Sequence, residues 1–415
     1  MYATVNFWVH PYHMQKPRVA QRRTERLSPD ALGEPAELTG ACSTGEARQA
    51  ATDALRRSQI TPHRATRFYY DQIRRSPYYE QLRHIVQPSV AELRSPGRWD
   101  TSGEREHTVV TGLQHKYPQT ALLLATANCF TYCRFCFRKR LIETGSDEIA
   151  LDYSKVAAYI SQHPEINNVL FSGGDPFTLS TAQLGSILDR ILPIPHLTSI
   201  RFGTKAIVYC PPRFRDEQLR FLFERIQKAG KTPVIVTHID HLGEVSEETE
   251  VRVRELRAGG VQFFNQAVLL KKINDDPEIL AATFQKLHCL GVRPYYLFQA
   301  RPTKSASHFQ VPFRRGLEIV RDVNRRLSGI EKTFRYIMSH EVGKLEILDL
   351  SRGNRLYMRY HQSSDVRQIG TLFSRTVAKD ACWLDDLPNK SRPDSPAQTA
   401  TTPRRHRKKQ TAAAR

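Results

Sequence analysis

Three closely spaced cysteines have the residue type and the spacing to hold an iron–sulfur cluster. Cys129, Cys133 and Cys136 form a C-x3-C-x2-C pattern directly after the apolar run 121–125. Cysteine thiolates are the usual protein ligands of such clusters. Three thiolates can hold a cuboidal cluster of four irons and leave one iron open to a molecule that is not protein. The pattern therefore predicts a cluster with a free coordination position, which favours chemistry over a purely structural role.

A structural zinc ion is the main alternative for these cysteines. Such sites take four ligands, usually two C-x2-C pairs or one pair with distant histidines, and the sequence has no second pair. Chance clustering of buried cysteines is a weaker alternative, because Cys129 follows an apolar run and precedes a basic, aromatic loop. We therefore favour the iron–sulfur cluster.

The bulk composition is that of an ordinary globular protein. The chain has 415 residues, 40% of them hydrophobic and 25% charged, enough for one large core or two modest ones. No apolar run approaches the ~18 residues of a membrane span, and the N-terminus lacks a basic region followed by an apolar core. The seven cysteines are an odd number, and the clustering of three of them fits a reducing compartment. We expect a cytoplasmic protein with no membrane association.

The formal net charge is +20, and its distribution matters more than its sum. Residues 389–415 contain eight Lys or Arg and one Asp, which places +7 in a stretch rich in Ser, Thr, Pro and Ala. Such a run is typical of a disordered, solvated tail, and weak binding of polyanions is the functional alternative. The remaining charge fits a protein that binds anionic cofactors and substrates. No nucleic-acid partner is expected beyond weak contacts of the tail.

Strand-like and helix-like segments alternate through the middle of the chain. Buried strands are predicted at 121–125, 168–171, 199–202, 233–237, 261–264 and 295–299. Helices are predicted at 155–162, 181–191, 216–228, 247–258 and 277–290. This alternation indicates βα units and a parallel sheet. Six strands are too few for a closed eightfold barrel, so we expect an α/β fold built as a partial (β/α)6 barrel.

Polar residues follow the predicted strands at the positions where such barrels carry their active sites. In these folds the site lies at the C-terminal ends of the strands. The residues found there are Asn128, Cys129, Ser172–Asp175, Gly203, His238, Gln266 and Gln299. We expect them to lie around one site.

The cysteine loop after the first strand resembles the radical S-adenosylmethionine superfamily. In that superfamily the free iron binds the amino and carboxylate groups of S-adenosyl-L-methionine. The turn Ser172-Gly173-Gly174-Asp175 matches the superfamily's glycine-rich segment, whose exposed backbone contacts the methionine amino group. A Gly-Gly turn by itself is most often only a tight loop. The resemblance implies a [4Fe-4S] cluster and S-adenosyl-L-methionine as cofactors.

Over roughly residues 61–387 the sequence is similar to the lysine 2,3-aminomutase family. The matching segments are 112–118 (GLQHKYP), 132–140 (YCRFCFRKR), 237–238 (TH), 265–270 (NQAVLL), 274–275 (ND), 293–299 (RPYYLFQ), 307–309 (SHF) and 343–344 (GK). The resemblance implies an isomerase that moves the amino group of an amino acid from C2 to C3, which yields a β-amino acid. It also implies an electron donor such as flavodoxin or ferredoxin.

The family's second cofactor is pyridoxal 5′-phosphate, held covalently by a lysine that follows a glycine late in the chain. Lys344 occupies that place. A lysine needs partial desolvation to be a nucleophile near neutral pH, whereas most lysines are simply solvated. Lys116 and Tyr117 match positions near the cofactor phosphate, with Lys116 in place of the family's arginine. A lysine still neutralises a phosphate, but without bidentate geometry.

Three further residues match positions of the family that bind substrate or cofactor. Arg138 matches the arginine that binds the substrate α-carboxylate, a task that suits a planar guanidinium. His238 and Gln266 match positions that contact S-adenosyl-L-methionine. Without the resemblance, each of these two would be read as an ordinary polar core residue.

Two positions depart from the family and bear on the substrate. The lysine enzymes hold the distal ammonium of their substrate with two aspartates, and here those positions are Arg301 and Ile337. A buried arginine repels a lysine side chain and favours a carboxylate, which points to glutamate or another side-chain acid. The alternative is that Arg301 faces solvent and that Ile337 lines a pocket for an apolar or quite different amino acid.

The family's zinc-binding cysteines are also missing. Asp276 fills the first of these positions, and only Cys382 remains near the C-terminus. We therefore do not expect zinc-bridged assembly, and the oligomeric state stays open.

Apolar residues between Phe68 and Ile85 recur roughly at helical spacing, with a break at Pro77, and indicate a short helical layer before the barrel. The predicted organisation is a poorly ordered arm at 1–58, a helical layer at 59–110, the barrel at 111–300, a part that carries Lys344 at 301–388 and a disordered basic tail at 389–415.

Two other functions stay open on this evidence. A radical enzyme that modifies a protein or an RNA would use the same cysteine loop, and its basic tail would contribute affinity for phosphate. A non-catalytic iron–sulfur protein that has lost its substrate site is the other alternative, which the residues Arg301 and Ile337 make conceivable.

Overall fold

The computed structural model describes residues 61, 63–143 and 147–388. The predicted arm at 1–58 and the predicted basic tail at 389–415 lie outside the described residues. Among the described helices, none combines the length and the apolar composition that a membrane span requires.

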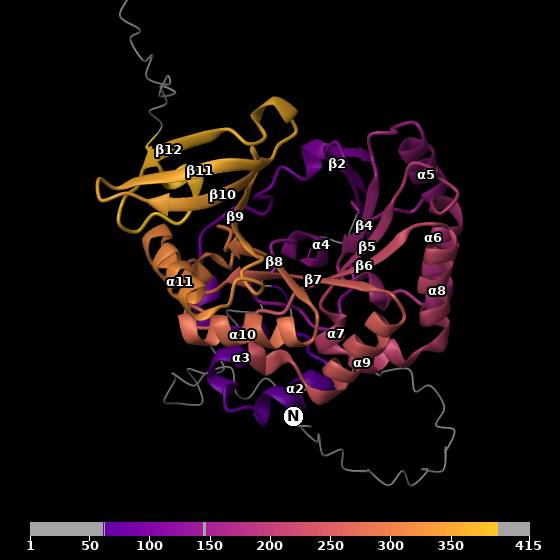
Figure 1. Ribbon diagram of the computed structural model, residues 1–415, viewed down its shortest axis with the longest axis horizontal. Helices are drawn as coiled ribbons and strands as arrows, with labels where there is room; N and C mark the ends of the chain where they lie inside the picture. The colour runs from indigo at the N-terminus through magenta and orange to yellow at the C-terminus, as the bar shows by residue number, and fades with distance from the viewer. Residues whose placement is uncertain (1–60, 62, 144–146, 389–415) are drawn as a thin grey trace, which may run out of the picture. The chain divides into compact units, whose positions relative to one another are not determined.

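Six parallel strands form the centre of a mixed sheet (Figure 1). They pair in chain order, each in parallel with the next. The strands are β3 (Thr120–Thr126), β4 (Asn168–Gly173), β5 (Ser199–Thr204), β6 (Thr232–Thr237), β7 (Gln262–Leu269) and β8 (Arg293–Gln299). Each of them contains the strand predicted from the sequence, apart from small shifts at the ends. The predicted α/β class with a parallel sheet is confirmed.

Helices connect these strands and cover the outer face of the sheet (Figure 1). They are α5 (Tyr153–Ser161), α6 (Thr181–Ile191), α8 (Glu217–Lys228), α9 (Glu247–Ala258) and α10 (Pro277–Cys289). Their starts are set by side-chain caps: Ser180 and Gln183 form a reciprocal capping box, and Asp276 accepts from the backbone N–H of Glu278. The ring of Phe202 in β5 packs against Phe171 of β4 and against Phe177, which follows β4.

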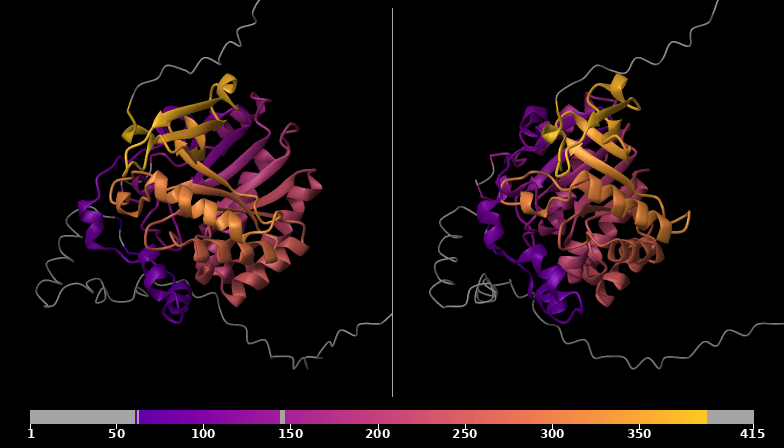
Figure 2. Two further views of the ribbon diagram at one scale, coloured as in Figure 1. Left: turned by 60° about the vertical axis from the view of Figure 1, so that its left-hand side comes forward. Right: turned by 90° about the vertical axis from the view of Figure 1, so that its left-hand side faces the viewer.

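The predicted helical layer before the barrel is present. It consists of α2 (Arg67–Arg74) and α3 (Tyr79–Val86), followed by the 3-10 turn η2 (Val90–Arg94). Figure 2 shows these N-terminal helices (indigo) and the C-terminal strands (yellow) at opposite ends of the folded body. The end of the range predicted as helical is instead β1 (Thr108–Val110), which pairs antiparallel with β2 (Leu113–Tyr117). β2 in turn pairs antiparallel with β3 and extends the sheet at this edge.

The sheet also continues past the six predicted strands. After α11 (Phe313–Arg326), β9 (Arg335–His340) pairs in parallel with β8 and makes a seventh parallel strand. Three antiparallel strands follow: β10 (Gly343–Leu350), β11 (Arg355–Gln362) and β12 (Leu372–Thr376). The predicted C-terminal extension is therefore part of the same twelve-stranded sheet. In the part of the chain that the structure describes, no pairing joins β1 to β12, so the barrel stays open.

Gly112 lies in the turn between β1 and β2, and a substitution there tests how tightly this edge of the sheet is packed. Its φ is +78°, and an added Cβ would lie 2.1 Å from the backbone nitrogen of Ala150. Gly112→Ala is expected to lower the free energy of unfolding by roughly 3 kcal/mol, because the clash adds to the strained backbone. Gly230 is the matched control, since its φ is +72° with nothing within 4 Å of an added Cβ. Gly230→Ala should cost only about 1 kcal/mol. Urea denaturation measures both, and equal losses would contradict the packing argument.

Candidate active site

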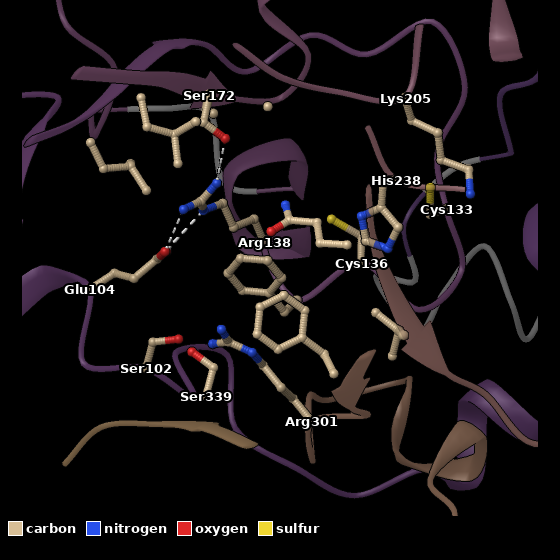
Figure 3. Close-up of a pocket in the computed structure, with 18 of the residues that line it drawn as sticks. Ser102, Glu104, Cys133, Cys136, Arg138, Ser172, Lys205, His238, Arg301 and Ser339 are labelled. Carbon is tan, nitrogen blue, oxygen red and sulfur yellow. Dashed lines mark hydrogen bonds and ion pairs between the residues drawn. The ribbon is translucent and has the colours of Figure 1, made fainter. Parts of the chain in front are cut away.

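A cavity of about 300 Å³ lies at the C-terminal ends of the parallel strands. The cysteine loop and the turns after the strands line it (Figure 3). Lys344 of β10 lines it as well. Fourteen of the fifteen residues predicted as site residues line this cavity, namely Cys129, Cys133, Cys136, Lys116, Tyr117, Arg138, Ser172, Gly173, Gly174, Asp175, His238, Gln266, Arg301 and Lys344. The structure thus brings together residues that are more than two hundred positions apart in the sequence.

Ile337 is the exception. It lies on β9, is fully buried, and is not among the residues that line the cavity. Ser339, two residues further along the same strand, lines the cavity instead. The prediction that Ile337 lines the substrate pocket is wrong. Burial of an apolar side chain within the sheet accounts for Ile337 without any contact to a ligand.

The cysteine loop connects β3 to the short helix α4 (Lys139–Glu143), which lies inside the curve of the sheet (Figure 1). Its backbone turns where the N–H of Cys136 donates to the carbonyl of Cys133, 3.1 Å away. Arg134 anchors the loop, because its buried guanidinium donates twice to the carboxylate of Glu92, at 2.9 and 2.7 Å. The ion pair with Glu92 therefore fixes the loop, and the three cysteines line the cavity.

The three thiols fit an iron–sulfur cluster. Burial raises the pKa of all three, that of Cys133 to about 12, so a positively charged partner is needed to stabilise the thiolates. Each thiolate of a cluster binds a different iron, so the three sulfur atoms need not converge on one point. Across residues 63–143 and 147–388, no three His, Cys, Asp or Glu side chains converge as ligands of a single metal ion.

The glycine-rich turn after β4 packs directly against the start of the cysteine loop. An added Cβ on Gly173 would lie 2.2 Å from the carbonyl oxygen of Thr126, and one on Gly174 would lie 2.2 Å from that of Asn128. Only glycine allows this approach. The two glycines therefore fix the distance between the turn and the loop, whichever ligand lies beside them.

Asp175 closes the same turn and points into the protein. Its carboxylate accepts hydrogen bonds from the Thr204 hydroxyl and from the backbone N–H groups of Phe177, Lys205 and Ala206. Burial raises its pKa, although these hydrogen bonds oppose the effect. Asp175 was predicted to bind a cofactor, but its hydrogen bonds tie the end of β4 to the segment after β5.

Arg138 is held by a buried carboxylate that sequence analysis did not identify. Its Nε and Nη2 donate to Glu104 at 3.0 and 2.7 Å, and its Nη1 donates to the Ser172 hydroxyl at 2.8 Å (Figure 3). Arg140 also donates to Glu104, at 2.6 Å. These cations hold the pKa of Glu104 at about 2 despite its burial. A guanidinium has five N–H donors, so two donors of Arg138 stay available for a substrate carboxylate.

Arg301 has no such counter-ion. Its guanidinium lies 4.0 Å from the centre of the Phe137 ring, and its buried Nη1 has no hydrogen-bond partner among the described residues. The Phe137 ring also contacts the guanidinium of Arg138, at 4.8 Å. Burial lowers the pKa of Arg301 to about 10. A buried donor without a partner is costly, so this group is poised to bind an anion.

Lys344, the second residue of β10, also lines the cavity. Gly343 lets the chain pass close to β11, since an added Cβ would lie 2.4 Å from the carbonyl oxygen of Gln362. The Lys344 Nζ donates to the Gln362 side chain at 2.7 Å and lies 5.1 Å from the Tyr117 ring centre. Burial, followed by the charges of Arg201, Arg301 and Lys116, lowers the pKa of Lys344 to about 7. Lys344 therefore meets the requirement for a nucleophilic amine near neutral pH.

Lys116, His238 and Gln266 complete the predicted set. The Nζ of Lys116 donates to the backbone carbonyls of Ser102 and His340, at 2.8 and 3.1 Å, and burial lowers its pKa to about 8. The Nε2 of His238 lies 3.3 Å from Asp240, and Gln266 faces the cavity beside it. Their roles stay predictions. Nothing in their local sequence marks the other lining residues Glu104, Arg201, Lys205, Tyr209 and Gln362.

Known proteins with similar sequences identify the family. No protein-family model matches the chain. A protein of Aquifex aeolicus (strain VF5), named provisionally as an L-lysine 2,3-aminomutase, is 40% identical over 309 residues, which is 74% of this chain and 82% of that protein. The chain belongs to the lysine 2,3-aminomutase family. It is thus a homologue of radical S-adenosylmethionine aminomutases, and the predicted resemblance is confirmed. Family membership implies a [4Fe-4S] cluster and S-adenosyl-L-methionine.

Two further members of the family are more distant. The L-lysine 2,3-aminomutase of Escherichia coli (strain K12) is 31% identical over 64% of this chain and 77% of its own length. That of Clostridium subterminale is 33% identical over 58% of this chain and 56% of its own length. The solved structure of the radical S-adenosylmethionine methyltransferase TsrM from Kitasatospora setae covers 46% of this chain and 38% of its own, with 16% identity and a TM-score of 0.33, which is too low to support an argument.

The low pKa of Lys344 predicts selective labelling. With a pKa of about 7, roughly three quarters of its amine is unprotonated at pH 7.5. Lys344 should therefore be acylated by trace anhydride faster than the largely exposed Lys155, as measured by mass spectrometry. Arg301→Met removes one of the cations that lower this pKa, so it should raise the pKa and slow the labelling. Equal rates at the two lysines in the unmodified chain would contradict the assignment.

Glu104→Gln tests the carboxylate that holds Arg138. Removing one partner of a buried ion pair should lower the free energy of unfolding by roughly 3 kcal/mol. Glu80→Gln removes an exposed partner of Arg83 and should cost below about 1 kcal/mol. Because the folded-state pKa of Glu104 lies below its unfolded value, its stabilisation is complete above pH ~4.5 and is lost as the pH falls toward 2. Denaturation curves at pH 7 and pH 3 measure the free energy of unfolding of each variant. A destabilisation by Glu104→Gln that is as large at pH 3 as at pH 7 would contradict the assignment.

Proposed function

We propose that this chain is a radical 2,3-aminomutase that moves the amino group of an amino acid with an acidic side chain, such as glutamate, from C2 to C3. The observation that carries the choice of substrate is Arg301, a cavity-lining guanidinium with a buried, unpaired Nη1. The family supports the reaction type. The position of Arg301 beside Arg138 supports the substrate class.

The residues of the cavity divide by the group that they would hold. Cys129, Cys133 and Cys136 would ligate the cluster, and the turn after β4 with His238 and Gln266 would contact S-adenosyl-L-methionine. Lys344, Lys116 and Tyr117 would hold pyridoxal 5′-phosphate. When bound, these groups supply a radical that removes hydrogen from C3 and a carrier for the migrating amine. A small electron-transfer protein such as flavodoxin or ferredoxin would provide the electron.

The side chains of this chain would position the substrate and keep water away. Three N–H groups of Arg138 donate to Glu104 and Ser172. Its two remaining N–H groups would donate to the α-carboxylate of the substrate. The Phe137 ring touches both Arg138 and Arg301, so an apolar surface separates the two anion sites. Lys344 would supply an unprotonated amine at neutral pH, because its pKa is about 7.

The charge balance of the cavity favours an acidic substrate. Glu104 compensates Arg138 and Arg140, and Asp240 with Glu244 compensates Lys205. Arg301, Lys116 and Lys344 have no carboxylate partner within salt-bridge distance among the described residues. A cofactor phosphate and the side-chain carboxylate of a substrate would supply the missing negative charge. The ammonium of a lysine substrate would instead add to the repulsion.

A panel assay tests the reaction and the substrate together. The anaerobically reconstituted chain, with S-adenosyl-L-methionine, pyridoxal 5′-phosphate and dithionite, is incubated with single amino acids, and β-amino products are separated by chromatography and mass spectrometry. Glutamate should be converted faster than lysine, with release of 5′-deoxyadenosine. Preferred turnover of lysine would refute the acidic substrate. Release of 5′-deoxyadenosine without any β-amino acid across the panel would refute the aminomutase.

Arg301→Met should selectively impair the acidic substrate. Loss of one partner of a desolvated charge pair costs about 2 kcal/mol or more, so kcat/KM for glutamate should fall at least roughly 30-fold. Arg220→Met, at a largely exposed arginine that pairs with Glu224, is the matched control and should leave kcat/KM unchanged. A similar fall for every amino acid in the panel would mean that Arg301 holds a cofactor rather than the side chain.

A further inference from the structure

We propose that the hydroxyl of Tyr209 donates a hydrogen bond to the cluster ligand Cys133 and thereby raises the reduction potential of the iron–sulfur cluster. Tyr209 ends the short helix α7 (Ala206–Tyr209) after β5, and its Oη lies 2.9 Å from the Sγ of Cys133. The inference rests on the cluster at Cys129, Cys133 and Cys136. It does not depend on pyridoxal 5′-phosphate or on the identity of the substrate.

The tyrosine is held in this position from several sides. Its ring meets that of Tyr69 edge-on, with centres 4.6 Å apart and an angle of 82°. The hydroxyl of Thr66 donates to its backbone carbonyl. The Nζ of Lys205 lies 5.4 Å from its ring centre and is itself fixed by Asp240, at 2.6 Å. These contacts fix the position of the Tyr209 side chain. The sequence of α7 alone gives no indication that it lies at the cysteine loop.

The hydroxyl is a donor rather than an acceptor in the presence of a thiolate. A phenol has an ordinary pKa of about 10, so its hydroxyl carries a proton at neutral pH. A cysteine that ligates iron is a thiolate without a proton of its own. The only proton between the two atoms is then that of the phenol, which points from oxygen to sulfur.

Such a donor favours the reduced cluster. Reduction adds one electron to the cluster and increases the negative charge on its sulfur ligands. Hydrogen bonds to the sulfurs stabilise the more negative state and raise the potential. Cys136 also has a donor, the backbone N–H of Arg138, which no side-chain substitution removes. Tyr209 therefore provides the side-chain contribution that can be tested.

The test is a redox titration of the cluster itself. The unmodified chain and Tyr209→Phe are reconstituted anaerobically with iron and sulfide, and titrated with dithionite in the presence of mediators while the electron paramagnetic resonance signal is followed. Tyr209→Phe should assemble the same amount of cluster with a lower midpoint potential. Tyr69→Phe is the matched control, since it removes the hydroxyl that donates to Glu244 and leaves the Tyr209 hydroxyl in place. Its potential should equal that of the unmodified chain.

The outcomes separate this inference from the proposed function. Equal potentials for Tyr209→Phe and the unmodified chain would overturn it, as would an equal shift in Tyr69→Phe. Absence of a cluster from the unmodified chain would overturn both the inference and the cluster assignment. A lowered potential in Tyr209→Phe supports the inference even if no amino acid is converted. Tyr209→Leu also lacks the hydroxyl, and it gives the same comparison should Tyr209→Phe not fold.

Discussion

The carboxylate of Glu104 lies in the wall of the cavity and accepts hydrogen bonds from both Arg138 and Arg140. Buried cations are costly unless they are paired, and this one carboxylate compensates two of them. Glu104 and Ser172 together accept from three of the five N–H groups of Arg138, which leaves two for a ligand. Arg301, Lys116 and Lys344 line the same cavity and have no carboxylate within salt-bridge distance among the described residues. Burial is the main cause of the lowered pKa values of these three groups, and neighbouring cations add to it.

Close backbone packing fixes the cysteine loop relative to the turns that follow β4 and β5. The glycines after β4 press against the start of the cysteine loop, and Asp175 ties the same turn to the segment after β5. That segment carries Lys205 and Tyr209, which contact Phe135 and Cys133 of the cysteine loop. A displacement of one turn would therefore move the cysteine loop and its hydrogen-bond donor together. Gly173, Gly174 and Asp175, which the sequence predicts as cofactor contacts, therefore also hold these turns together.

Of the two positions that depart from the family and bear on the substrate, Arg301 lines the cavity and Ile337 does not. Arg301 stands where the lysine enzymes have an aspartate, and it touches the same phenyl ring as the arginine assigned to the α-carboxylate. Two guanidinium groups on one apolar ring are suited to a molecule with two carboxylates. In the proposed function the radical chemistry is that of the family, and one exchanged charge changes which substrate side chain is tolerated, since like charges at short range in a dry site are strongly disfavoured.

The sequence by itself determined the parts of this protein that depend on local pattern. The strands and helices of the barrel follow from periodicity and caps, such as Ser180 and Asp276 at helix starts, and the cysteine spacing predicted the cluster. Only the tertiary structure decided the rest. The prediction ended the barrel at residue 300, so it missed α11 and β9, which continue the parallel sheet beside β8. Ile337 is buried away from the cavity, whereas Glu104 and Tyr209 reach it. Which side chains meet across a fold depends on long-range packing, and no local pattern in the chain encodes those contacts.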